Sequence, residues 1–136
     1  MNRTEARAAA MKLLYEMEMG GDGGEDTKLN LLEVSPGEDE SDYMNQTFEG
    51  AKGMLGELDE RIQRYCVGWK LERVTRVDLS ILRLAVYELL RGEIPAGVVI
   101  NEAVELSRVY STDKAGSFIN GVLGSMQRDM EAGVAP

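Results

Sequence analysis

The chain has 136 residues and a mass of 15.0 kDa, which suits one compact domain over residues 1–136. It has no apolar run of the ~20 residues that span a bilayer and no signal-peptide stretch, so we expect a cytoplasmic protein without membrane contact. With no histidine and one cysteine, the chain lacks Ser-His and Cys-His nucleophiles, His-containing metal sites and an internal disulfide. We therefore expect neither an enzyme nor a bound metal or cofactor.

The net charge of −9 is distributed unevenly along the chain. Residues 22–49 carry nine acidic side chains against Lys28, whereas residues 61–91 carry seven basic side chains against three acidic ones. A basic middle segregated from an acidic stretch is compatible with a nucleic-acid footprint. Charge alone favours the simpler alternative, a solvated helix surface with salt bridges.

Helical spacing of apolar residues predicts a helix over residues 3–18. Its inward face consists of small and apolar side chains: Ala6, Ala10, Leu13, Leu14 and Met17. Arg3 and Arg7 fall on one edge of this face and Tyr15 lies outside it. These three side chains are candidates for a ligand surface. The alternative is two solvated arginines and a tyrosine that packs on a neighbouring helix.

A long connection is expected over residues 19–41, where glycines, acids and a Ser-Pro-Gly sequence interrupt the helical pattern. The glycine cluster at 20–24 lacks the Gly-Lys-Ser/Thr ending of a phosphate loop, so we interpret it as part of a flexible acidic loop. A short helix is compatible with residues 28–34.

Two helices, or one bent helix, are expected between residues 43 and 66, because apolar residues recur at helical spacing on both sides of Gly56. Trp69 follows, and we expect it to anchor a turn in the core rather than to stack on a ligand. Cys66 is interpreted as a small packed residue and not as a reactive thiol.

The most hydrophobic segment, residues 77–90, predicts a central buried helix. Arg83 is the exception within it, and its guanidinium must reach solvent, pair with an acid or bind an anion. Gly92 provides a stop signal for this helix.

Two further helices are predicted after Pro95. The first has one apolar face: Val99, Ala103, Leu106 and Tyr110. A break with capping residues at 111–113 precedes the second helix, which is predicted over residues 114–130. Phe118 in this helix is either part of the core or a base-stacking surface. No segment alternates as a strand would, so the predicted fold class is all-α, an antiparallel helical bundle.

Three motifs in this order resemble the NusB family: ILRLAVYEL at 81–89, INEAVEL at 100–106 and FINGVL at 118–123. Together with the Leu14-Tyr15 pair, the resemblance covers nearly the whole chain apart from residues 19–41. It implies about seven helices in two small sub-bundles. It also implies a role in transcription antitermination of ribosomal RNA operons.

Proteins of this family bind boxA-type RNA together with NusE, a small-subunit ribosomal protein, in an RNA polymerase antitermination complex. By position, the resemblance implies RNA contacts for seven residues: Arg3, Arg7, Tyr15, Arg83, Lys114, Ser117 and Phe118. Asp78 matches an acidic position that contacts NusE. Some relatives also form homodimers that hide the RNA surface.

The N-terminal segment has few arginines and includes Glu5, so we expect weak RNA binding by the chain alone and dependence on NusE. The alternative is a protein-binding module that tethers or buffers the ribosomal protein with little RNA contact. An enzyme is a third possibility, since NusB-like domains also occur fused to RNA cytosine methyltransferase domains. Because the sequence has 136 residues, we do not expect that second domain.

Overall fold

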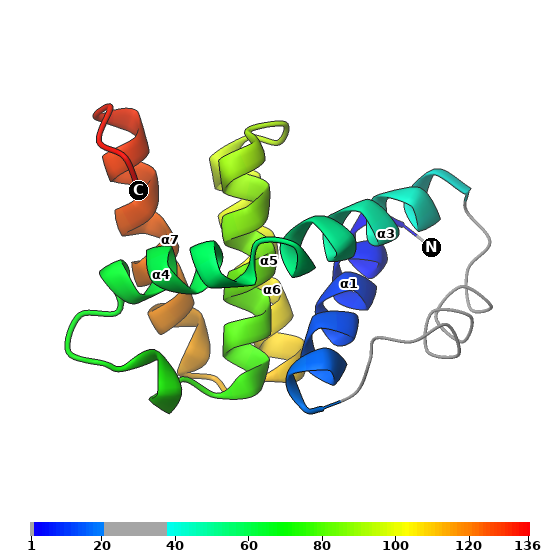
Figure 1. The fold of residues 1–136 in the computed structure, drawn as a ribbon, viewed down its shortest axis with the longest axis horizontal. Helices are drawn as coiled ribbons and strands as arrows, with labels where there is room; N and C mark the ends of the chain where they lie inside the picture. The colour runs from blue at the N-terminus through cyan, green and yellow to red at the C-terminus, as the bar shows by residue number, and fades with distance from the viewer. Residues whose placement is uncertain (1, 21–37) are drawn as a thin grey trace.

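The structure, a computed structural model, describes residues 2–20 and 38–136, with the side chains of 38–40 excepted. All regular elements in this part are helical (Figure 1), so the predicted all-α class is confirmed, with six α-helices described where about seven were expected. They are α1 (Arg3–Glu18), α3 (Glu38–Lys52), α4 (Leu55–Tyr65), α5 (Arg76–Arg91), α6 (Ala96–Tyr110) and α7 (Ala115–Glu131), with a 3₁₀ turn η1 (Leu71–Arg73). None of the described helices is long and apolar enough to cross a membrane.

Helix α5 is the centre of the fold and contacts each of the other five α-helices. Thr75 caps its start by accepting a hydrogen bond from the Asp78 N–H at 3.2 Å. Gly92 ends it in a left-handed conformation, at a φ of 66°. Every residue from Asp78 to Leu89 is buried, which confirms the central helix predicted over 77–90.

Two small groups of helices share α5, in agreement with the predicted sub-bundles. Helices α1 and α3 pack on each other and on α5, and they lie on one side of it in Figure 1. Helices α6 and α7 pack on each other and on α5, and α4 contacts α5 and α7. The N-terminal and C-terminal parts of the chain therefore contribute separate halves of one core.

Small residues allow α1, α3 and α5 to approach closely. Ala6 and Ala10 of α1 are fully buried. Gly50 of α3 lies against the ring of Tyr87 on α5, and a Cβ added at this glycine would overlap that ring. The position of α3 therefore requires a residue without a side chain at this crossing.

Two aromatic side chains predicted to be inside the core lie at the surface instead. Trp69 is 55% exposed, because the Gln63 amide holds its turn by donating to the Trp69 carbonyl and accepting from the Leu71 N–H, both at 2.8 Å. Leu71, rather than Trp69, packs on the core. Tyr110 lies in the last turn of α6 and is 38% exposed, with the Lys12 Nζ 4.9 Å from its ring centre.

The connection predicted over residues 19–41 is described only at its two ends. Met19 ends α1, and α3 begins at Glu38, so the last residues of the expected connection are helical. The short helix considered for 28–34 lies outside the described residues.

Candidate nucleic-acid interface

A groove of about 370 Å³ lies where the turn after α4, the start of α5 and the start of α7 meet. Two aromatic side chains, Trp69 and Phe118, and two basic ones, Arg73 and Lys114, line this Trp69–Phe118 groove. Asp78, from the first turn of α5, lines it as well. The structure thus brings together three predicted site residues from two helices: Asp78, Lys114 and Phe118.

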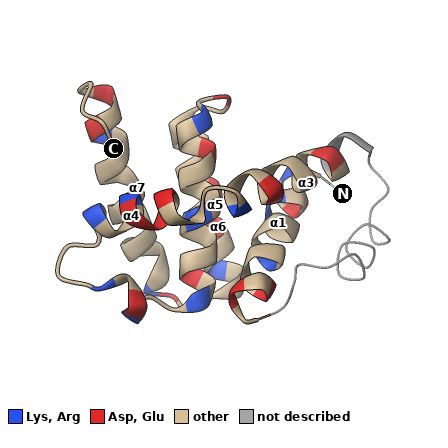
Figure 2. Ribbon diagram, viewed as in Figure 1, with Lys and Arg blue, Asp and Glu red and all other residues tan. Residues whose placement is uncertain are grey.

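The basic side chains of the Trp69–Phe118 groove form no ion pair with the described residues. Arg73 and Lys114 are exposed, and neither takes part in an ion pair within the described part of the chain. Basic residues elsewhere alternate with acidic ones along most helices (Figure 2), as in the pair of Arg61 with Glu57 at 2.8 Å. The groove therefore differs from the salt-bridged surface that charge alone favoured.

The start of α7 places backbone N–H groups beside this groove, and that of Ala115 donates to the Thr112 carbonyl at 3.1 Å. Lys114 is the N-cap residue, its side chain makes no capping hydrogen bond, and the first turn contains no acidic residue. The first N–H groups of a helix have no partner within it and lie at the positive end of its dipole, so they favour an anion. Ser117, another predicted site residue, is exposed in this same region and lines a neighbouring groove between α6 and α7.

Asp78 links the two helices that form the groove. Its side chain is 8% exposed, and its Oδ1 accepts a hydrogen bond from the Ser111 hydroxyl at 2.6 Å. A capping residue was expected within 111–113, but Lys114 takes the N-cap position without a side-chain hydrogen bond. The Ser111 hydroxyl instead ties the turn between α6 and α7 to the first turn of α5.

The two N-terminal arginines have different surroundings. Arg3 is exposed, and its guanidinium carbon lies 3.9 Å from the ring centre of Tyr43. Arg7 is 5% exposed and forms a buried ion pair with Glu88 at 3.2 Å. A second ion pair joins Arg7 to Glu102 at 3.9 Å. Burial and the hydrogen bond that its hydroxyl donates to Glu88 raise the pKa of Tyr43.

Arg3 and Arg7 lie apart from the Trp69–Phe118 groove. Glu88 and Asp78 are ten residues apart on α5, which corresponds to roughly 15 Å along the helix. A ligand that contacts both places must extend across the molecule.

Arg83 joins three helices and is 5% exposed. Its guanidinium donates to both carboxylate oxygens of Asp59 on α4, each at 2.8 Å, and to Glu18 on α1 at 2.8 Å. Glu18 also pairs with Arg76 at 3.2 Å. Burial opposes the charge of Arg83, but the hydrogen bonds to the two acids outweigh it and raise the pKa of the guanidinium. Of the three possibilities for Arg83, pairing with acids is the one that the structure shows.

Tyr15 is half-buried on α1 and packs on the core, outside the Trp69–Phe118 groove. The sequence analysis missed two members of the groove, Trp69 and Arg73. A signal for Trp69 was present, because it lies between Gly68 and Lys70 in a turn, where a side chain can remain outside the core.

The structure bears on two kinds of reactive group, metal ligands and the cysteine thiol. No group of three or more His, Cys, Asp or Glu side chains among them is placed to hold a metal ion. Cys66 is 4% exposed, and burial raises the pKa of its thiol, which disfavours the reactive thiolate.

Comparison with known proteins identifies the family. A sequence profile described as the NusB family matches residues 4–128. The transcription antitermination protein NusB of Acetivibrio thermocellus is 44% identical over 128 residues, covering 93% of this chain and 88% of the relative.

Solved structures agree with this assignment. T. maritima NusB aligns with a TM-score of 0.82 and 34% identity over 100% of this chain and 94% of that one. A chain from the crystal structure of the antitermination factors NusB and NusE with dsRNA aligns with a TM-score of 0.83 and 29% identity, over 93% of this chain and 96% of that one. The protein described here belongs to the NusB family.

Proposed function

We propose that this protein is a transcription antitermination factor that binds boxA-type RNA of ribosomal RNA operons as a heterodimer with NusE, within the RNA polymerase antitermination complex. Its curated relatives are transcription antitermination proteins, and one solved relative was crystallised with NusE and RNA. Such a role is non-enzymatic and cytoplasmic. The observation that carries the proposal is the Trp69–Phe118 groove, where aromatic rings and unpaired cations lie together.

Each part of the groove has a separate task in binding RNA. Trp69 and Phe118 offer ring faces on which unpaired bases stack. Lys114, Arg73 and the positive end of the α7 dipole bind phosphates. Aromatic stacking and phosphate contact together are how single-stranded RNA is commonly held.

The other predicted RNA contacts fall into two sets. Arg3 is exposed and Tyr15 is half-buried, so both remain proposed contacts. Arg7 and Arg83 are buried and occupied by acids, so we assign them the positioning of α1 and α5 rather than direct contact.

Asp78 is the proposed contact to NusE. Its Oδ1 is bonded to Ser111, and no described residue bonds to its second carboxylate oxygen, which is therefore open to a basic partner at the groove. NusE bound at this place would lie next to Lys114 and Phe118 and extend the RNA surface.

The test is a titration of boxA-type RNA and of a scrambled control with the chain mixed with its NusE. Phe118→Ala should weaken boxA binding about tenfold, because stacking on an aromatic ring is worth about 1–3 kcal/mol per base. Phe118 is half-buried, so the unfolding midpoint of the variant is measured in parallel.

Tyr110→Ala, which removes another partly exposed ring in a different place, is the control. If Phe118→Ala stays folded and binds boxA as tightly as the unchanged chain, the proposed site is wrong. If the two proteins pair but RNA affinity does not rise, the chain is a partner-binding module.

A further inference from the structure

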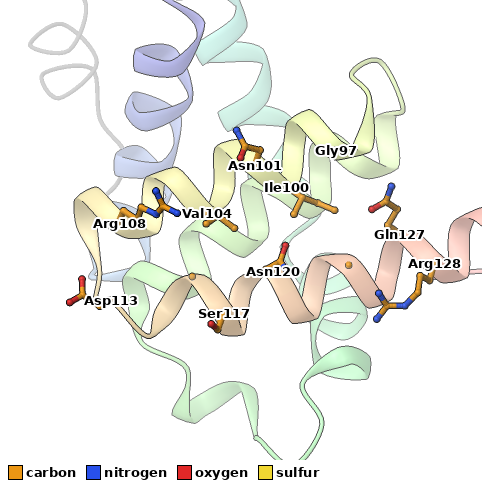
Figure 3. Close-up of a pocket in the computed structure, with 12 residues that line it drawn as sticks. Gly97, Ile100, Asn101, Val104, Arg108, Asp113, Ser117, Asn120, Gln127 and Arg128 are labelled. Atoms are coloured by element: carbon orange, nitrogen blue, oxygen red, sulfur yellow. The ribbon is translucent and has the colours of Figure 1, made fainter.

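A second and larger groove, of about 680 Å³, runs between α6 and α7 (Figure 3). Figure 3 shows Arg108 and Arg128 toward its opposite ends, with Asn101 and Asn120 between them. Among the residues that line this α6–α7 groove, Ser117 is the one that the sequence predicts as an RNA contact.

We infer that the α6–α7 groove binds a single-stranded RNA segment continuous with the one in the Trp69–Phe118 groove. Arg108 and Arg128 contact its phosphates, and the amides of Asn101 and Asn120 contact base edges or ribose hydroxyls. The inference rests on the proposed RNA-binding function and adds a second binding surface to it.

The two grooves meet at the start of α7. Lys114 and Phe118 line the first groove, whereas Ser117 lines the second. Neighbouring residues of a helix are about 100° apart around its axis, so the grooves lie on adjacent flanks of one turn. A strand that leaves the first groove crosses the positive end of the α7 dipole, where a phosphate is favoured, and enters the second.

The cations of the α6–α7 groove are available to phosphate. Arg128 is exposed, donates to the Ser125 hydroxyl at 3.0 Å and takes part in no ion pair with the described residues. Arg108 is 68% exposed and pairs with Glu105, itself 47% exposed, at 3.1 Å. Such exposed pairs contribute little, so a phosphate can replace the carboxylate. Asp113 is the only acid of the lining.

The remaining lining fits RNA better than a protein. Ile100, at 7% exposed, and the half-buried Val104 are its only large apolar side chains, and no aromatic ring lines it. A protein partner is usually held by exposed aromatic or apolar anchors. Amide side chains offer both donors and acceptors, which suits the edges of unpaired bases.

Two substitutions test the groove by different means, and each has a matched control. Arg128→Gln removes a cation from the last turn of α7, and Arg64→Gln removes one from the last turn of α4. Gly97→Gln places a side chain in the mouth of the groove. Its control, Gly56→Gln, adds the same side chain to α4, outside the groove. Both glycines are the second residue of their helix, and a Cβ added at either meets nothing within 4 Å, so all four proteins should fold.

The measurement compares a short boxA-type RNA with the same RNA extended by about six unpaired nucleotides at either end, each titrated into the complex with NusE. Extension at one end should raise the affinity about tenfold. Arg128→Gln and Gly97→Gln should remove most of this gain, and Arg128→Gln should also lower the slope of log affinity against log salt by about 0.7. Arg64→Gln and Gly56→Gln should retain the gain.

No gain from extension at either end, or a gain that survives both groove substitutions, overturns the inference while leaving binding of the short RNA intact. Weaker NusE binding in Gly97→Gln with an unchanged gain would assign the groove to a protein instead, and also overturns it. If even the short RNA does not bind, the proposed function fails first.

Discussion

Arg3, Arg7 and Arg83 have the same side chain in three different surroundings. Arg3 is exposed and stacks on Tyr43, whereas Arg7 and Arg83 are each 5% exposed and paired with carboxylates. Removing a buried guanidinium takes from its acids the cation that offsets their charge, so the loss appears as a loss of stability. An RNA-binding defect in an Arg7 or Arg83 variant therefore needs a stability measurement beside it.

Arg83→Met should lower the free energy of unfolding by about 3 kcal/mol, since Asp59 and Glu18 lose their shared cation. Urea unfolding followed by circular dichroism measures this change. Arg64→Met is the control, because Arg64 pairs with Glu60 at the surface, and it should cost less than about 1 kcal/mol. Equal losses in the two variants would show that the Arg83 ion pairs contribute no more than an exposed pair.

Helix α3 approaches α5 closely at Gly50. Gly50 leaves room for the ring of Tyr87, and Glu88, the next residue of α5, accepts a hydrogen bond from Tyr43 of α3. The same Glu88 pairs with Arg7 of α1. One region of α5 therefore sets the positions of both N-terminal helices.

Gly50→Ala should destabilise the protein by about 1–3 kcal/mol, because the new methyl group overlaps the Tyr87 ring. Intrinsic helix propensity alone predicts the opposite sign, a gain of up to about 1 kcal/mol. Gly121→Ala in α7 is the matched control, since an added Cβ there meets nothing within 4 Å, and it should stabilise the helix. Thermal unfolding compares the two, and a higher midpoint for Gly50→Ala would disprove the close approach.

At the scale of the whole molecule, the net charge of −9 opposes RNA binding. Many cations are already used within the protein, as in the pairs of Arg61 with Glu57, Arg76 with Glu18 and Arg91 with Glu93. Arg73, Lys114 and Arg128 take part in no ion pair with the described residues, and they lie on the two proposed RNA grooves. Few phosphate contacts are therefore available to the chain by itself.

We expect the complex with NusE to bind boxA-type RNA at least about tenfold more tightly than the chain alone, because a basic partner adds phosphate contacts. The complex should also show the steeper dependence of affinity on salt. Titrations at several salt concentrations, with NusE alone as the control, measure both quantities. Equal affinity with and without NusE would contradict the proposed heterodimer.

The sequence by itself determined the helices and the family. Apolar periodicity predicted helices over 3–18, 77–90 and 114–130, within one or two residues of their observed ends, because each buries a continuous stripe of side chains. Three ordered motifs carried the resemblance that the family comparison confirms. Both are properties of residues close together in the chain.

Only the tertiary structure decided which side chains remain available to a ligand. Periodicity places Arg7 and Arg83 on helices, but their acid partners come from other helices, so their burial was not predictable from local spacing. Trp69 lies outside because Gln63 holds its turn, and it meets Phe118 only where α7 packs beside that turn. The candidate groove consists of contacts between residues distant in sequence, and these form only when the helices pack together.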